Sequence, residues 1–321
     1  MQIFVLGMHR SGTSLIARLI NLMGAYFGGE GAGLPTNEEN PKGFWERRDV
    51  VDLNERLILE RGATWYDVLP FVEHWRNPAA GPVASDVSAA IGTLIAELDA
   101  HRPWFIKDPR LCLTLGNWRA HCEVPVAVVC ARNIGAIATS LSRRSGLTDM
   151  SYEEAAALCR AYLAIMLRQL GDMPRVIVEY ERFVEKPEEE TRRLHAALCD
   201  LGVGGALRMP TAIEIESFVE PSLQRSRGTR ELEPLSAQFV AALGESAQID
   251  EWLSGNTLDI LRQFSQRRTR VAQEQQDRRE AVAGLSERLS NEGMRALLTG
   301  DEARHDAGTP WTWERLRKLL D

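Results

Sequence analysis

The stretch GMHRSGTS, residues 7–14, separates a short apolar run at residues 2–7 from an amphipathic helical pattern at residues 13–23. Two glycines in such a turn let successive backbone N–H groups converge on one point. The helix that follows directs the positive end of its dipole to the same point, so that an anion is stabilised there. The stretch therefore predicts a phosphate-binding loop between the first strand and the first helix of an α/β fold.

The loop departs from the nucleotide-binding template G-x-x-x-x-G-K-[ST] at one position. Gly7, Gly12 and Ser14 match the template, whereas Thr13 stands in the position of its lysine. That lysine normally reaches the β- and γ-phosphates of a nucleotide, and its absence removes the usual contact with a triphosphate. Arg10 supplies a cation within the loop instead. We therefore expect the loop to bind a phosphate-like group other than the γ-phosphate of ATP.

Short apolar runs alternate with helical patterns along the first two thirds of the chain. The runs that predict strands are residues 2–7, 104–107, 125–131 and 175–180. The helical patterns are residues 13–23, 47–60, 87–98, 134–144, 152–170 and 187–201. Such alternation requires crossover connections and is typical of a doubly wound parallel sheet flanked by helices. We predict an α/β domain of the P-loop type over residues 1–250, followed by a helical C-terminal extension over residues 251–321.

Composition excludes several classes of protein. The 321 residues carry a net charge of −7, with 44% apolar and 26% charged residues, which are values of an ordinary globular protein. The acidic balance argues against a nucleic-acid partner, and no apolar run approaches the ~18 residues that span a membrane. The five cysteines form no C-x-x-C pair, which favours reduced thiols over a zinc site. Since the first residues show no secretory signal pattern, we expect a cytoplasmic protein that requires no metal.

Three segments, in the same order along the chain, resemble the sulfotransferases that use 3′-phosphoadenosine 5′-phosphosulfate (PAPS). The loop HRSGTS resembles their 5′-phosphosulfate loop, the strand PVAVVCA that leads to Arg132 resembles their 3′-phosphate motif, and RVIVEYERF resembles their segment before a late helix. The resemblance implies a P-loop-like core, PAPS as donor and adenosine 3′,5′-bisphosphate as product. The residues that it assigns to nucleotide binding are Arg10, Ser11, Gly12, Thr13, Ser14, Arg132, Ser140, Tyr180, Arg225 and Arg227.

Two cations and a carboxylate are the catalytic groups that the resemblance implies. Arg10 is the first cation, and Lys107 is the second, because its Lys-Asp-Pro segment is similar to that of tyrosylprotein and bacterial sulfotransferases, in which the lysine lies at the sulfuryl group. Transfer also requires a base for the acceptor proton. Glu46 ends a block, NPKGFWE, that resembles bacterial members, and Glu30 has the spacing from Arg10 of the base in tyrosylprotein members. Both carboxylates remain candidates, with Glu46 preferred.

Three classes of function remain in competition. A sulfotransferase that acts on a hydroxyl or amine of a carbohydrate, a glycolipid or a small molecule agrees best with the three segments. A P-loop kinase and a non-catalytic nucleotide-binding protein are the alternatives, and the missing loop lysine argues against the kinase. Aromatic residues among charged ones at residues 28–45 and 63–82 suit a saccharide or small-molecule acceptor. For residues 251–321, packing on the core, formation of a homodimer and linkage to another domain all stay open.

Overall fold

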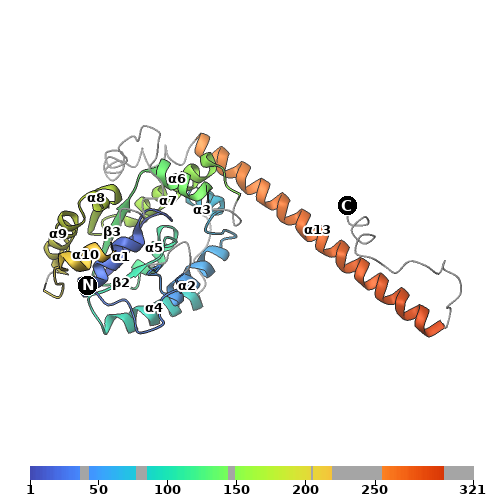
Figure 1. The fold of residues 1–321 in the computed structure, drawn as a ribbon, viewed down its shortest axis with the longest axis horizontal. Coiled ribbons are helices and arrows are strands. Elements are labelled where there is room, and N and C mark those ends of the chain that lie inside the picture. The colour runs from blue at the N-terminus through green and yellow to red at the C-terminus, as the bar shows by residue number, and fades with distance from the viewer. Residues whose placement is uncertain (37–42, 77–84, 144–148, 204, 219–254, 300–321) are drawn as a thin grey trace. The chain divides into compact units, whose positions relative to one another are not determined.

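Four parallel strands form one sheet in the order β2-β1-β3-β4 (Figure 1). The strands are β1 (Gln2–Leu6), β2 (Trp104–Lys107), β3 (Pro125–Ala131) and β4 (Arg175–Glu179). The inner strand β1 pairs on one side with β2, where Val5 lies opposite Lys107, and on the other side with β3, where Leu6 lies opposite Val129. Because all the pairs are parallel, the carboxyl ends of the four strands meet at one edge of the sheet.

The helices follow the predicted alternation and add elements that the pattern did not reveal. Their bounds are α1 (Thr13–Leu22), α2 (Arg48–Leu59), α3 (Leu69–Arg76), α4 (Ser85–Asp99), α5 (Leu111–Arg119), α6 (Ile134–Ser142), α7 (Tyr152–Leu170), α8 (Tyr180–Glu185), α9 (Pro187–Leu198), the π-helical turn η1 (Cys199–Val203) and α10 (Ala212–Phe218). Ser151 begins α7 with a capping box, in which its hydroxyl and the Glu154 carboxylate each accept from the other's backbone N–H.

The sequence pattern misassigned Tyr180 and missed four helices. Tyr180 was predicted to end the last strand, but it begins α8, so that β4 ends one residue earlier. Helices α3, α5, α8 and α10 were not predicted. In α5 the first five residues and Trp118 are buried, so its apolar residues run together and do not recur with a clear amphipathic period.

Helices cover both faces of the sheet, because successive side chains of a strand point to opposite faces. Phe4 and Leu6 of β1 belong to a buried cluster with residues of α2 to α7, whereas Ile3 and Val5 belong to a second cluster with residues of α1, α9 and α10. Every residue of β1 is buried, as expected for an inner strand of a covered sheet. Figure 1 shows the strands between these two helical layers, which confirms the predicted doubly wound α/β fold.

The computed structural model describes residues 1–36, 43–76, 85–143, 149–203, 205–218 and 255–299. Contacts divide the chain into one unit, Met1–Ser265, and a second, Gln266–Asp321. The domain boundary predicted at residue 250 lies outside the described residues. Within the described part of the chain, no helix combines the length and the apolar character needed to cross a membrane.

The C-terminal extension contains a long helix, α13 (Asn256–Thr299). Its first turns belong to the first unit, where Leu258, Leu261 and Phe264 are buried in the same cluster as residues of α2 to α7, so packing on the core is observed for this part of the extension. From residue 266 to residue 284 its side chains are mostly polar and mostly exposed, and the exposed ones include Val271 and Val282. Hydrogen bonds between residues four positions apart, such as Gln273 to Asp277, support this solvated stretch.

Candidate active site

Predicted site residues lie at the carboxyl end of every strand of the sheet. Arg10 follows β1, and Lys107 ends β2. Arg132 follows β3, and Tyr180 follows β4. The chain leaves the inner strand β1 first toward β2 and later crosses to β3 on its other side. Open parallel sheets bind their ligands at this edge, beside such a change of direction.

The phosphate loop turns sharply between β1 and α1. Arg10 and Gly12 both adopt left-handed backbone conformations, with φ of 68° and 93°. Gly12 is the N-cap of α1, and because it has no side chain it provides no side-chain cap. The first N–H groups of an uncapped helix need a partner from elsewhere, and an anion suits them because of the helix dipole.

Residues predicted to hold the 3′-phosphate of the nucleotide converge on this loop. Arg10 Nε donates to Ser140 Oγ on α6 at 2.9 Å, and Arg132 Nη1 donates to the carbonyl oxygen of Arg10 at 2.7 Å. The guanidinium of Arg132 also lies 4.3 Å from the centre of the Tyr180 ring, in a cation–π contact. The structure thus brings these four residues, from four separate segments, into one cluster.

Near the phosphate loop, some buried polar atoms have no hydrogen-bond partner among the residues that the structure describes. They include Ser11 Oγ and Arg132 Nε. An unpaired buried donor costs free energy, and native proteins seldom leave one without a ligand or a water molecule. Burial also lowers the pKa of Arg132, although Tyr180 and Glu181 oppose this effect. A desolvated guanidinium beside an unpaired hydroxyl and an uncapped helix fits a bound phosphate.

Gly12 allows the Tyr180 ring to pack on the loop, which gives a first testable prediction. A Cβ at residue 12 would lie 2.2 Å from Cδ2 of Tyr180, and its φ is unfavourable for any other residue. We expect Gly12→Ala to lower the free energy of unfolding by about 2 kcal/mol and to displace Tyr180. Urea unfolding measures the first effect. The matched control is Gly29→Ala, since a Cβ at Gly29 meets nothing within 4 Å; equal stability of the two variants would contradict the prediction.

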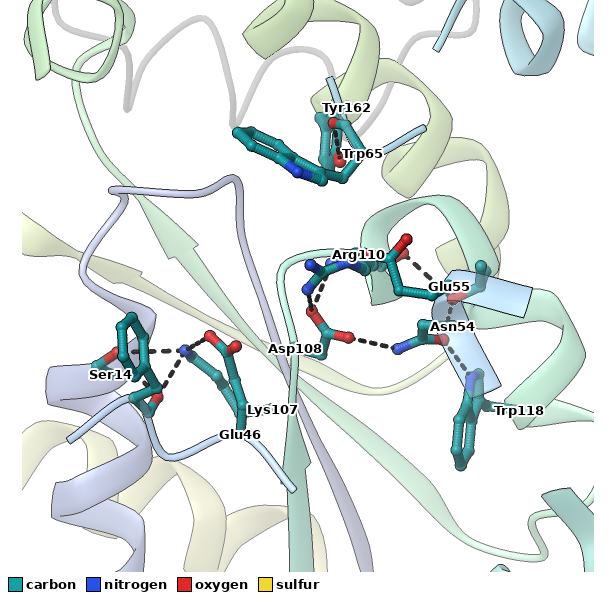
Figure 2. Close-up of polar contacts among 12 residues, drawn as sticks. Ser14, Glu46, Asn54, Glu55, Trp65, Lys107, Asp108, Arg110, Trp118 and Tyr162 are labelled. Atoms are coloured by element: carbon teal, nitrogen blue, oxygen red, sulfur yellow. Dashed lines mark hydrogen bonds and ion pairs between the residues drawn. The ribbon is translucent and has the colours of Figure 1, made fainter. Parts of the chain in front are cut away.

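The ammonium of Lys107 lies at the end of β2, beside the start of α1. It donates to Glu46 Oε1 at 2.5 Å, to the carbonyl oxygen of Phe44 at 2.8 Å and to Ser14 Oγ at 3.2 Å (Figure 2). These three oxygens use all three N–H donors of the ammonium. The side chains of Lys107 and Glu46 are only 2% and 10% exposed. The structure therefore contains a buried ion pair next to the phosphate loop.

A strained turn at residues 44–46 brings both the carbonyl oxygen of Phe44 and the carboxylate of Glu46 to Lys107. Trp45, between Phe44 and Glu46, has a φ of 56°, which is uncommon for a large residue. The adjacent Arg47 anchors the segment, because it donates to the Phe27 carbonyl oxygen at 3.1 Å and pairs with the Asp49 carboxylate. Backbone hydrogen bonds between residues 46–48 and residues 32–34 also hold this turn in place.

Burial and the neighbouring charges act in opposite directions on the pKa of the Glu46 carboxyl. Burial raises its pKa above the ordinary value, and Asp108 raises it further, whereas Lys107 and Arg110 lower it without cancelling the effect of burial. A carboxylate with a raised pKa is a better proton acceptor than an ordinary one. Oε1 is occupied by Lys107, and no hydrogen bond of Oε2 is recorded within the described residues. The free oxygen is the one that suits a base.

Comparison with known proteins decides the family of the chain. The model of the sulfotransferase family matches residues 2–201, which include all four strands and the phosphate loop. The chain belongs to the sulfotransferase family. No curated protein matches it.

Solved structures that resemble this sulfotransferase include two domains of biosynthetic enzymes. One is the sulfotransferase domain from the curacin biosynthetic pathway, with 15% identity, coverage of 75% of this chain and 96% of that chain, and a TM-score of 0.40. The other is the sulfotransferase domain from the Synechococcus PCC 7002 olefin synthase, with 18% identity, coverage of 82% and 94%, and a TM-score of 0.39.

A second polar cluster of this sulfotransferase lies beside the Lys107–Glu46 pair. Asp108 is fully buried and accepts from Asn54 Nδ2 at 2.8 Å and from Arg110, through both its backbone N–H and Nη1, at 3.1 and 3.0 Å. Arg110 Nε in turn donates to Glu55. Burial lowers the pKa of Arg110, but Asp108 and Glu55 outweigh it, so that the net pKa is raised and the guanidinium stays charged.

Asn54 connects this cluster to the core and gives a second prediction. Its Oδ1 accepts from Thr114 Oγ1 at 2.7 Å and from Trp118 Nε1 at 2.8 Å, while its Nδ2 serves Asp108. We expect Asn54→Ala to lower the free energy of unfolding by about 3 kcal/mol, because it leaves buried partners unpaired. Thermal or urea unfolding measures this loss. Asn117→Ala is the control, since no hydrogen bond of its side chain is recorded within the described residues, and a loss as large there would contradict the assignment.

The structure treats the two predicted bases differently. Glu46 contacts Lys107, whereas Glu30 is exposed on the surface. Arg225 and Arg227 lie outside the described residues, so their predicted contact with the nucleotide stays a prediction. Thr13 and Ser14 begin α1 as predicted.

Sequence reasoning missed two members of the second cluster. Asn54 and Glu55 lie within an ordinary amphipathic helix, so no motif singles them out. For Arg110, which ends the segment Lys-Asp-Pro-Arg, an interaction with Asp108 is one of the options that the sequence leaves open, and the structure shows it.

Proposed function

We propose that the protein transfers a sulfuryl group from PAPS to a hydroxyl or amine of a carbohydrate, a glycolipid or a small-molecule acceptor. The observation that carries this proposal is the pair of unpaired buried atoms, Ser11 Oγ and Arg132 Nε, at a loop whose neighbour is the Lys107–Glu46 ion pair. The first feature suits a nucleotide that carries phosphates, and the second suits proton and charge transfer. Neither requires a metal ion.

Different residues would bind the two ends of the nucleotide's phosphate groups, the 5′-phosphosulfate and the 3′-phosphate. The loop N–H groups, Ser11, Thr13 and Ser14 would hold the 5′-phosphosulfate, because the helix dipole favours negative charge there. Arg132 and Ser140 would hold the 3′-phosphate, with Arg10 between them. Bound PAPS supplies a sulfuryl group that is activated by its link to a phosphate.

Proton and charge transfer would involve Glu46 and Lys107. The acceptor oxygen forms a bond to sulfur while the bond from sulfur to the bridging phosphate oxygen breaks. Glu46 takes the proton of the acceptor on its free oxygen, and Lys107 donates a hydrogen bond to the bridging oxygen as negative charge builds there. The products are the sulfated acceptor and adenosine 3′,5′-bisphosphate, and the proton resides on Glu46 until solvent removes it.

Ligand binding tests the proposal against the kinase alternative. We expect adenosine 3′,5′-bisphosphate to bind the full-length protein in calorimetry with EDTA present, and Mg-ATP not to compete. Arg132→Gln should weaken that binding at least about tenfold, because it removes a charge-assisted contact with phosphate. Arg119→Gln, which removes an arginine paired with Asp172 on the surface, is the matched control. Tighter binding of Mg-ATP would favour a kinase and contradict the proposal.

A screen identifies the acceptor class. The protein is incubated with donor labelled in the sulfuryl group and a panel of saccharides, glycolipids, phenols and amines, and labelled products are separated from free sulfate. We expect transfer to at least one hydroxylated acceptor. Binding of the nucleotide without transfer to any compound would favour the non-catalytic alternative.

A further inference from the structure

Beside the Lys107–Glu46 pair, Arg110 and Glu55 form a preorganised pair of a donor and an acceptor of hydrogen bonds. We propose that this pair binds a second hydroxyl of an uncharged, polyhydroxylated acceptor, while the reacting hydroxyl lies at Glu46. The inference rests on the proposed function, since it names the class of acceptor for the same site. It follows from the geometry of the guanidinium, from the charge of the cluster and from the residues that surround it.

Two N–H groups of the Arg110 guanidinium are held by carboxylates, and its other N–H groups can donate to a ligand. Nε donates to Glu55 and Nη1 to Asp108, which uses two of its five N–H groups, and no other hydrogen bond from the guanidinium is recorded within the described residues. The side chain is 13% exposed. Asp108 is itself held by Asn54, so the guanidinium cannot rotate without breaking a buried network. A fixed donor loses little entropy on binding a ligand.

Glu55 supplies the complementary acceptor. Its side chain is 33% exposed, and one of its oxygens accepts from Arg110 while the other has no recorded partner within the described residues. A hydroxyl both donates and accepts hydrogen bonds, so it can donate to Glu55 and accept from Arg110 at once. The pair therefore matches an alcohol better than a purely anionic or purely cationic group.

The charge of the cluster selects against anions. Glu55 and Asp108 each carry one negative charge and Arg110 carries one positive charge, which leaves a net charge of −1. The two carboxylates already neutralise the guanidinium, and an anionic substituent of an acceptor would be repelled in a partly buried site. The cluster thus offers hydrogen bonds without net positive charge.

Chain order and electrostatics relate this pair to the Lys107–Glu46 pair, since Asp108, which binds Arg110, directly follows Lys107. Both Asp108 and Arg110 act electrostatically on Glu46, and Arg110 also acts on Tyr162. Tyr162 donates to the carbonyl oxygen of Trp65, whose ring lies 4.6 Å from the ring of His9 in the phosphate loop. In Figure 2 the end of the Arg110 side chain lies between Trp65 and Asp108 and points to the side of Lys107 and Glu46. The inference places one acceptor across both centres.

Saturation-transfer NMR on the full-length protein tests the inference with two defined probes. Methyl β-glucoside is an uncharged polyol, and methyl β-glucuronoside differs from it by a carboxylate. With adenosine 3′,5′-bisphosphate present, we expect clear transfer to the glucoside and about tenfold less to the glucuronoside. Arg110→Lys and Glu55→Gln should each weaken the glucoside signal about tenfold, because each removes one hydrogen bond to a charged group.

Controls separate this inference from the proposed function and from misfolding. Glu60→Gln, an exposed carboxylate that follows the same helix, should leave the signals unchanged. Glu55→Gln should also raise the glucuronoside signal relative to the glucoside, because the cluster becomes neutral, and a folding defect would not do so. Absent or equal signals from the two probes in the unmodified protein, or glucoside binding that survives Arg110→Lys, would overturn the inference. Loss of nucleotide binding alone would instead count against the proposed function.

Discussion

Replacement of Lys107 by methionine is expected to reduce sulfuryl transfer by about 10²- to 10³-fold, the usual cost of removing one donor to charge that develops during a reaction. Methionine fills a similar volume, so the loss would come from the missing ammonium. The ammonium lies between Glu46 and Ser14 at the start of α1, which is where the leaving oxygen of a nucleotide held by the loop would lie. Turnover with labelled donor and the acceptor found by screening measures the effect.

Two further variants make this result interpretable. Lys186 is an exposed lysine paired with Glu189, and Lys186→Met should leave turnover unchanged. Lys107→Met also leaves Glu46 buried without its partner, which favours the protonated form of the carboxyl. The double variant Lys107→Met with Glu46→Gln removes that secondary effect, and it should remain folded and as inactive as the single variant. Transfer within threefold of the unmodified protein in Lys107→Met would contradict a role for this lysine.

Glu46→Gln is expected to lower turnover by about 10²- to 10⁴-fold, the usual contribution of a positioned base. Glutamine can still accept a hydrogen bond from Lys107, so the turn around Trp45 should persist, but the amide cannot take the proton of the acceptor. Glu30→Gln is the matched control, because Glu30 is the alternative base and is exposed. Loss of turnover in Glu30→Gln alone would show that Glu46 is not the base.

The pH dependence of turnover gives an independent check of Glu46. Burial raises the pKa of its carboxyl, so the rate should rise with pH along a limb that is centred above the ordinary glutamate value. The same raised pKa means that Glu46 contributes most to stability below its unfolded-state pKa, and that this contribution is lost as pH rises through its folded-state value. Glu46→Gln should abolish the acidic limb in whatever activity remains. A limb that persists in this variant would assign it to another group.

The strands and the phosphate loop could be predicted because each depends on local sequence. Residues 104–107 and 125–131 were predicted with the bounds that the structure shows, since both runs are almost wholly apolar and end at a charge or a turn. The loop at residues 7–14 has its own spacing of glycines. Helix α5 was not predicted, because its buried residues are consecutive and lack the period on which such predictions depend.

The partners of the site residues could not be predicted, because they are far apart in the chain. The contact of Lys107 with Glu46 joins residues 61 positions apart, and that of Arg10 with Ser140 joins residues 130 apart. The sequence pattern identified each residue type, whereas the packing of helices on the sheet decides which side chains meet. Asn54 illustrates the limit, since its role exists only through three partners contributed by other elements.

The three hydrogen bonds of the Lys107 ammonium also bear on which anions can bind there. Because its three donors already serve Glu46, Phe44 and Ser14, an incoming anion gains only the difference between its own hydrogen bonds and those that it displaces. Free sulfate, inorganic phosphate and chloride are abundant and bring no further contacts to compensate. A nucleotide that also contacts the phosphate loop can compensate for the hydrogen bonds that it displaces from Lys107. We therefore expect inorganic anions to bind weakly at Lys107, and a nucleotide that also contacts the phosphate loop to bind there more tightly.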